Sequence, residues 1–363
     1  MKKNKNYVDL KDQPVPEGQH LLEVDDLKMY FHTEDGVVRA VDGVSYTLDR
    51  GETLGVVGES GSGKSVTAMT IMGLISMPPG KIEGGDVRYR GRSILEMTEE
   101  EMQHIRGNDI AMIFQDPMTS LNPVYKIGKQ VGEGLRLHRG YSKQEALKRA
   151  TELLDLVGIP EPEKRVNEYP HQFSGGMRQR VMIAMALACD PDILIADEPT
   201  TALDVTIQAQ IIELMQEMQE KNGNAIIMIT HDLGVVADMA DKIMVMYAGR
   251  PVEFGTAEEI FYESRHPYTW GLIRSIPEQA IDEKKPLTPI HGNPPSLMNL
   301  PEGCVFSPRC PYATDKCRKQ RPERVVTESG HYSACHYSGD PEFLKNAPET
   351  SRTCKDSKKG GEA

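Results

Sequence analysis

The chain has 363 residues and a formal net charge of −12 at neutral pH. This length suits about two domains, and the acidic balance argues against nucleic acid as a partner, because contacts to a phosphate backbone need a basic face. The sequence has no apolar run of about 18 residues, as a membrane span would need, and its basic first residues lack the apolar stretch of a signal peptide. We therefore expect a cytoplasmic chain.

The first elements expected along the chain are strands. Residues 1–20 form a polar lead-in, and the residues after it alternate apolar and polar side chains on both sides of an Asp35–Gly36 turn. This is the pattern of a β-hairpin, which we assign to 21–31 and 37–48 and interpret as part of an antiparallel β subdomain. Short apolar runs predict further strands at 53–57, 86–90 and 110–114.

A glycine-rich loop follows the strand at 53–57. Gly58–Ser65 reads Gly-Glu-Ser-Gly-Ser-Gly-Lys-Ser, matches G-x-x-x-x-G-K-[ST], and precedes a helix-compatible stretch at 66–75. Strand, loop and helix in this order are the setting of a phosphate-binding loop, in which backbone N–H groups and the helix N-terminus hold an anion. The lysine would reach the β- and γ-phosphates, and the final serine hydroxyl would bind Mg²⁺. The alternative is a Gly/Ser-rich turn with a chance lysine.

We assign nucleotide binding in this stretch to the loop residues and the first residue of the helix, namely Gly58, Ser60, Gly61, Ser62, Gly63, Lys64, Ser65 and Val66.

The pattern then becomes helical, and this stretch predicts an inserted helical subdomain at about 120–175. At its end, Ser174, Gly175 and Gly176 open another helix. Free N–H groups at such a helix start can bind a second anion; an ordinary N-cap at Ser174 is the alternative. Two phosphate-binding helix starts in one chain suggest a nucleotide held between two copies of the domain.

Polar residues follow three of the predicted strands. The apolar strand 193–196 ends in Asp197 and Glu198, which could hold Mg²⁺ and orient the attacking water. Gln115 follows the strand at 110–114 and could contact Mg²⁺ or the water, and His231 ends another strand and could bond the γ-phosphate. The alternatives are a solvated acidic strand end, a polar loop residue and a structural histidine.

The remaining elements complete an α/β pattern. An amphipathic helix is expected at 203–220 and buried strands at 225–229 and 243–246. Strands and helices that alternate in this way predict a mainly parallel sheet covered by helices. Prolines are dense between 277 and 301, which indicates a linker or an extended segment, and a polar tail follows residue 341.

Four cysteines cluster in the C-terminal part of the chain, at Cys304, Cys310, Cys317 and Cys335. They lack the close pairs typical of structural zinc sites, and disulfides are uncommon in the cytoplasm. Four thiolates can hold a 4Fe–4S cluster, whose ligand spacings vary more. Zinc and unligated cysteines are the alternatives. We expect Cys310→Ser to loosen this module and to leave Gly58–Ser65 able to bind ATP.

Together these motifs resemble the nucleotide-binding subunits of ATP-binding cassette (ABC) transporters, over roughly residues 20–260. The family order of phosphate loop, glutamine loop, signature, Asp-Glu pair, Thr201–Asp204 and His231 is kept, although Phe173 and Met177 depart from the usual Leu and Gln of the signature. The resemblance extends to the peptide-importer branch, on the segments 114–123, 266–269 and 303–311.

This resemblance implies a P-loop ATPase of the ABC type at 21–262, a peptide-importer module with the four cysteines at 263–340, and a tail at 341–363. It implies a translocase with ATP and Mg²⁺ as cofactors, and it associates the cysteine module with 4Fe–4S. The implied catalytic residues are Glu198, His231 and Gln115, and the implied Mg²⁺ ligands are Ser65, Gln115 and Asp197. Nucleotide contacts are also implied for Ser174, Gly175, Gly176 and Asp204, with adenine stacked on Phe31 or, as the second choice, Tyr30.

The resemblance also implies the partners. These are a paralogous ATPase subunit in a head-to-tail heterodimer, two transmembrane permease subunits that meet the chain near 119–125, and an extracellular or periplasmic peptide-binding protein. The chain would then be peripheral at the cytoplasmic face of the membrane. The alternatives are the same machine importing nickel or another small solute, and a soluble ABC ATPase of DNA repair.

Overall fold

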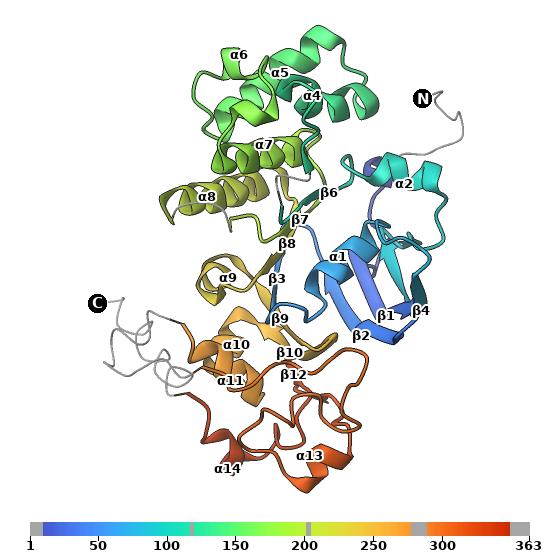
Figure 1. The fold of residues 1–363 in the computed structure, drawn as a ribbon, viewed down its shortest axis with the longest axis vertical. Coiled ribbons are helices and arrows are strands. Elements are labelled where there is room, and N and C mark those ends of the chain that lie inside the picture. Colours follow the sequence, from blue (N-terminus) through green and yellow to red (C-terminus); the bar gives the residue numbers. More distant parts are fainter. Residues whose placement is uncertain (1–9, 117–119, 201–204, 277–288, 349–363) are drawn as a thin grey trace.

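The computed structural model describes residues 10–116, 120–200, 205–276 and 289–348. Its parts are arranged around one large sheet, with a helical subdomain at one end, an antiparallel sheet at the side and the C-terminal module at the other end (Figure 1).

The strands are β1 Leu22–Thr33, β2 Gly36–Leu48, β3 Thr53–Val57, β4 Gly80–Tyr89, β5 Arg92–Ser93, β6 Ile110–Ile113, β7 Ile193–Asp197, β8 Ala225–Thr230, β9 Lys242–Tyr247, β10 Arg250–Thr256, β11 Val325–Val326 and β12 Tyr332–Ser333. The helices are α1 Lys64–Ile71, α2 Glu99–Ile105, α4 Ile127–His138, α5 Lys143–Leu156, α6 Pro162–Arg165, α7 Gly175–Leu187, α8 Val205–Asn222, α9 Leu233–Met239, α10 Ala257–Tyr262, α11 Pro267–Ile273, α13 Asp315–Lys319 and α14 Pro341–Leu344.

The large sheet has the order β11-β12-β10-β9-β3-β8-β7-β6, and the run from β9 to β6 is parallel. Its central strands β3, β7 and β8 are buried along their whole length. Helices cover both faces of such a sheet, which is why these strands are continuous apolar runs. The predicted α/β architecture is confirmed, and the carboxyl ends of β3, β6, β7 and β8 meet at one edge.

The second sheet, β2-β1-β4-β5, is antiparallel. The β1–β2 hairpin pairs Thr33 with Gly36 at its turn and Leu22 with Leu48 at its far end, close to the predicted bounds. One face of this sheet packs with α1 and the large sheet in a shared core that includes Met29, Val56 and Met72. Leu10 is buried in the same core, so the end of the polar lead-in is packed against the domain.

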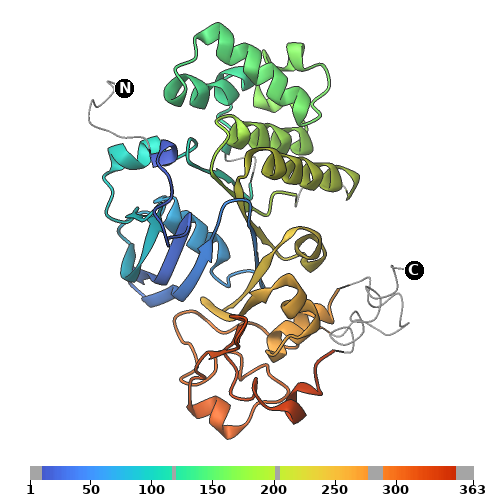
Figure 2. The same cartoon turned by 180° about the vertical axis from the view of Figure 1, so that it is seen from behind.

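The helical subdomain consists of α4, α5, α6 and α7 and lies apart from the antiparallel sheet, as both broad views show (Figures 1 and 2). A capping box between Ser142 and Glu145 begins α5, and Gly158 follows its end with a left-handed φ of 70°. Apolar side chains from α4, α5 and α7 form its core together with β6 and β7. It therefore shares its core with the strands that carry the predicted catalytic residues.

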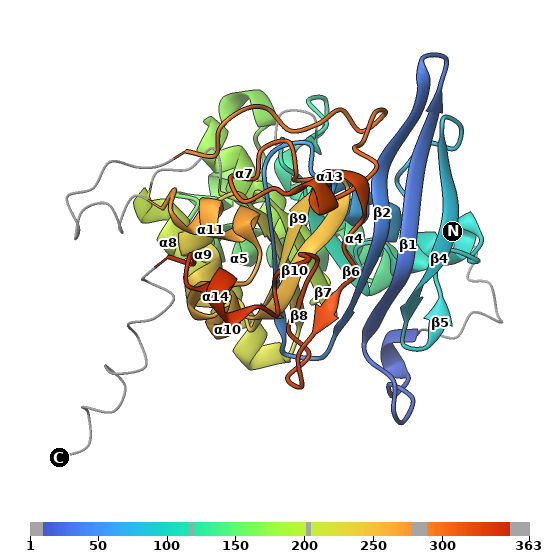
Figure 3. The same cartoon turned by 90° about the horizontal axis from the view of Figure 1, so that it is seen from below.

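The C-terminal module continues the large sheet instead of following it as a separate unit. β12 pairs with β10, and β11 pairs with β12. Figure 3, which looks at the molecule from below, shows this module in front of β9 and β10, beside the β1–β2 hairpin. Tyr247, Tyr268 and Phe306 make mutual ring contacts with centroids 4.6–5.3 Å apart where it meets the domain. Among the described residues, no helix has the length and apolar character needed to cross a membrane.

Candidate functional site: a nucleotide site at the strand ends

The phosphate loop is shaped by glycines in positions that a side chain could not occupy. Gly58 and Gly63 have left-handed φ angles of 149° and 101°. A Cβ on Gly58 would lie 2.2 Å from the carbonyl oxygen of Met246, and one on Gly63 would lie 2.3 Å from that of Ala40. The loop therefore fits closely between β2 and the end of β9, and Gly63 begins α1 directly.

Lys64 folds back into the loop that precedes it. Its ammonium group donates to the carbonyl oxygens of Gly58 at 2.6 Å and Glu59 at 3.0 Å, and its side chain is 6% exposed. Burial lowers the pKa of Lys64, and the nearby carboxylates of Glu198 and Asp197 oppose that shift. A partly desolvated cation held in a ring of backbone groups is well suited to bind a phosphate that replaces the carbonyl oxygens.

Ser65 and Asp197 meet across the space between α1 and β7. The Ser65 hydroxyl donates to Asp197 Oδ1 at 3.0 Å. Asp197 is 2% exposed, and burial raises its pKa while the Ser65 hydrogen bond lowers it. Two adjacent oxygen ligands of this kind suit Mg²⁺.

Glu198 gathers the other residues predicted to be catalytic. Gln115 Nε2 donates to one of its carboxylate oxygens at 3.2 Å, and His231 Nδ1 lies 3.3 Å from the other. The three residues follow β6, β7 and β8, whose carboxyl ends are adjacent. Glu198 also adopts a left-handed φ of 48°, a conformation that is uncommon outside glycine and frequent at functional sites.

The signature segment lies at the start of α7, on the helical subdomain. Ser174 caps this helix by accepting from the N–H of Met177 at 3.3 Å, so the ordinary N-cap is present. Ser174 and Gly175 are exposed, and a Cβ on Gly175 would meet nothing within 4 Å. Further along α7, the Gln179 side chain donates to the carbonyl oxygen of Pro199, which connects this helix to the Asp197–Glu198 strand end.

For the other predicted nucleotide contacts, the structure gives burial and neighbours. Ser60 is exposed, Ser62 is buried and Val66 packs against the shared core. Phe31 is half-buried on β1, and its neighbour Tyr30 donates its hydroxyl to Asp42 at 2.9 Å. Which of the two aromatic rings stacks on adenine stays a prediction. Asp204 lies outside the described residues.

Sequence reasoning missed the residues that hold the outer part of the phosphate loop. Arg309 donates to both carboxylate oxygens of Glu59, at 2.5 and 2.9 Å, and its side chain is 4% exposed. The N–H of Glu59 donates to the hydroxyl of Tyr268 at 2.9 Å. Both partners belong to the C-terminal module. Arg309 directly precedes Cys310, and Tyr268 lies on α11. Whether Cys310→Ser leaves ATP binding intact stays a prediction.

The four clustered cysteines line one small cavity of about 20 Å³, together with His266 and His336. Such a volume holds about one water molecule. In the part of the chain that the structure describes, no group of three or more His, Cys, Asp or Glu side chains has the arrangement of a metal site. The donor set fits a thiolate-bound metal, but its geometry here does not, and the predicted 4Fe–4S cluster is not supported.

The described geometry is that of a P-loop ATPase, and comparisons with known proteins specify its class. A family model described as ABC transporter matches residues 41–201. A dimeric ATP-binding cassette in a post-hydrolysis state with ADP and phosphate superimposes with a TM-score of 0.60 at 29% identity, over 65% of this chain and 98% of that one. The chain belongs to the ATPases of ABC transporters.

Within this class, the C-terminal module is distinctive. A second family model, the oligopeptide/dipeptide transporter C-terminal region, matches residues 252–317. The oligopeptide transport ATP-binding protein OppD of Bacillus subtilis is 58% identical over 86% of this chain and 87% of its own length. The dipeptide transport ATP-binding protein DppD of Escherichia coli is 52% identical over 88% and 97%. The chain is therefore a member of the family of oligopeptide and dipeptide transport ATP-binding proteins.

Proposed function

We propose that this chain hydrolyses ATP to power the import of oligopeptides or dipeptides through a membrane ABC transporter. The observation that carries the proposal is the position of Glu198 between Gln115 and His231, beside the Ser65–Asp197 pair. The similarity to peptide-transport ATPases supplies the cargo class.

The residues divide the chemistry among them. The phosphate loop and Lys64 would hold the β- and γ-phosphates, and Ser65, Asp197 and Gln115 would hold Mg²⁺, which supplies charge neutralisation when bound. Glu198 would accept a hydrogen bond from the attacking water and orient it toward the γ-phosphorus. His231 would donate to a γ-phosphate oxygen and so stabilise the charge that develops there.

The signature segment serves a second ATPase subunit in this proposal. Ser174 and Gly175 are exposed at the start of α7, on the subdomain remote from the antiparallel sheet. Two subunits that pair head to tail would place each signature against the nucleotide on the opposite phosphate loop. We assign the second subunit to a paralogous chain, and a peptide-binding protein outside the membrane to delivery of the cargo.

An apolar groove beside the glutamine loop supports a contact with permease subunits. Its cavity measures about 300 Å³, and its wall includes Leu74, Phe114 and Met182. Val124, which follows Ser120 of this wall closely in the sequence, is 71% exposed. Leu121 lies within the predicted 119–125 contact, where an exposed apolar side chain would be expected, but it is 4% exposed and belongs to the helical subdomain core, so that expectation is wrong. The groove suits an apolar segment of a partner at the cytoplasmic face of the membrane.

For the cysteine module we propose a bound 4Fe–4S cluster, with zinc as the alternative. Its support is the donor set, because Cys304, Cys310, Cys317 and Cys335 are free of disulfides and line one cavity, which would have to widen to admit a metal. Iron and zinc analysis of anaerobically purified protein tests this proposal. Four irons per chain would support the cluster, one zinc would support the alternative, and neither metal would refute both.

Transport in reconstituted vesicles tests the function itself. The chain, its paralogue, the permease subunits and the binding protein are placed in liposomes with ATP on the cytoplasmic side. Labelled di- and oligopeptide uptake should require ATP and stop with Glu198→Gln. ATP-driven uptake of nickel without uptake of peptide would overturn the cargo assignment and retain the ATPase.

A further inference from the structure

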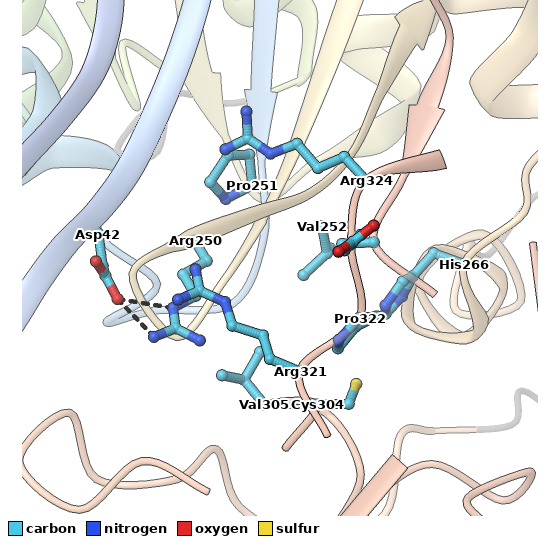
Figure 4. Close-up of a pocket in the computed structure, with 12 residues that line it drawn as sticks. Asp42, Arg250, Pro251, Val252, His266, Cys304, Val305, Arg321, Pro322 and Arg324 are labelled. Carbon is cyan, nitrogen blue, oxygen red and sulfur yellow. Dashed lines mark hydrogen bonds and ion pairs between the residues drawn. The ribbon is translucent and has the colours of Figure 1, made fainter. Parts of the chain in front are cut away.

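A second cavity lies behind the phosphate loop, where the antiparallel sheet, β10 and the C-terminal module meet. It measures about 550 Å³, within the range of small-molecule sites. The charged residues of its wall are three arginines and two acidic residues, Arg250, Arg321, Arg324, Asp42 and Glu323. Figure 4 shows Arg321 reaching toward Arg250 and Asp42, with Arg324 on the far side of Pro251.

Asp42, one of the two acidic residues of this wall, is already engaged. Asp42 is 5% exposed and accepts from Arg250 through Nε at 2.8 Å and Nη2 at 2.5 Å. Tyr30 donates to the same carboxylate at 2.9 Å. Asp42 and Arg250 therefore neutralise each other, and Asp42 has little capacity left for a further guanidinium.

The other two guanidiniums keep most of their donors available. Arg324 donates to the carbonyl oxygen of Gly43 and lies 5.0 Å over the ring of Tyr332. Within the described residues, Arg321 makes no hydrogen bond or ion pair. Partial burial and the charges of Arg250 and Arg324 lower the pKa of Arg321, as expected where cations crowd together.

We propose that this cavity binds a small phosphate-bearing anion, such as a diphosphate group, through Arg321 and Arg324 with Arg250 beside them. Guanidinium forks bind phosphate oxygens in pairs, and several forks on one cavity wall suit a group with many charged oxygens. On a chain whose net charge is −12, this cluster is a local exception. The anion would bridge the C-terminal module and the nucleotide-binding domain.

The cavity is close to the phosphate loop but distinct from it. The N–H of Asp42 donates to the carbonyl oxygen of Gly249 at 2.8 Å. The N–H of Gly249 in turn donates to the carbonyl oxygen of Ser62 at 2.9 Å. The cavity wall therefore reaches the back of the loop through two backbone hydrogen bonds. A test must separate this site from the loop, which also binds phosphate.

Calorimetric titration of the full-length Lys64→Ala chain with inorganic pyrophosphate, without Mg²⁺, makes this separation. We expect binding of pyrophosphate that weakens about tenfold or more when Arg321→Gln and Arg324→Gln are added, because charge-assisted hydrogen bonds are lost. The control pair Lys316→Gln and Lys319→Gln removes the same charge from α13, outside the cavity wall. It should leave the affinity within about twofold.

A measurement on the unmodified chain does not depend on the folding of a variant. Phenylglyoxal modifies accessible arginines, and peptide mass spectrometry reports the rate at each position. Pyrophosphate should slow modification of Arg321 and Arg324 and leave Arg318, which is exposed on α13, unchanged. Absence of this protection, or equal affinity in the two double variants, would overturn the site. Tighter binding of citrate than of pyrophosphate would overturn the phosphate class.

Discussion

The guanidinium of Arg309 donates to both carboxylate oxygens of Glu59, so a residue of the C-terminal module forms a bidentate ion pair with the second residue of the phosphate loop. Arg309 also donates to the carbonyl oxygens of His291 and Ile290 and lies 5.8 Å over the ring of Tyr247. The arginine is therefore fixed by its own module and can act as a rigid support for the loop.

Replacement of this arginine should weaken nucleotide binding without removing catalytic groups. We expect Arg309→Met to raise the Kd for MgATP about tenfold, which corresponds to about 1.4 kcal/mol. In the double variant with Glu59→Gln the two effects should not add, because both variants break one contact. Equilibrium binding of a fluorescent ATP analogue measures these values. Arg318→Met, at an exposed position on α13, is the control, and additive effects would contradict the support.

Lys64→Ala should lose most of the affinity for ATP, because no other cation replaces the charge on the β- and γ-phosphates. The substitution also leaves the carbonyl oxygens of Gly58 and Glu59 without the ammonium donor that they share in the nucleotide-free loop. Calorimetry with MgATP checks the affinity. Lys242→Ala, which removes a cation that pairs with Glu52 at a distance from the loop, should bind ATP normally.

Glu198→Gln should bind ATP and turn over at least about a hundredfold more slowly, because the neutral amide is a weaker hydrogen-bond acceptor than the carboxylate and cannot take a proton from the water. The amide keeps the size of the carboxylate, so the positions of Gln115 and His231 should be preserved. ATP would then hold the head-to-tail dimer closed. Size-exclusion chromatography with ATP and the paralogue should show this dimer; a monomer at saturating ATP would contradict the arrangement.

Cysteine crosslinking can locate the permease contact. Val124→Cys, at an exposed position that follows Ser120 of the groove wall closely in the sequence, should crosslink to permease subunits in membranes when a short bifunctional reagent is added. Val326→Cys is a matched control, since this valine is 61% exposed on β11 in the C-terminal module. Crosslinks from position 326 without any from position 124 would show that the groove is not the contact.

Acid should destabilise the chain through His266. This residue is 1% exposed, and burial lowers its pKa to about 4, against 6.5 for the ordinary side chain. Because the unfolded chain binds this proton more readily, stability falls as the pH drops below about 6.5, by about 2 kcal/mol at pH 5. Urea unfolding near pH 7.5 and pH 5 should show a smaller loss for His266→Asn, whose side chain can still cap α11. An equal loss would contradict this assignment.

Local patterns in the sequence were enough to predict the strands and loops that form the nucleotide site. The phosphate loop and the Asp197–Glu198 strand end each lie within a few residues of an apolar strand, and parallel pairing then brings their ends together. The Arg309–Glu59 contact has no such signal, because 250 positions separate its members. The burial of Leu121 likewise has no local signal, because its core partners lie on helices elsewhere in the chain.

The pairing of β12 with β10 has a practical consequence for anyone who wishes to study the ATPase in isolation. Phe254 and Glu253 are registered against Tyr332 and Ser333, and the N–H of Ala334 donates to the carbonyl oxygen of Val252 at 2.8 Å. A fragment that stops near residue 262 would leave this row of peptide groups open to solvent. Such an unprotected edge recruits strands from other molecules. The shortened protein would tend to associate through β10, and its measured turnover would describe aggregates instead of the working subunit.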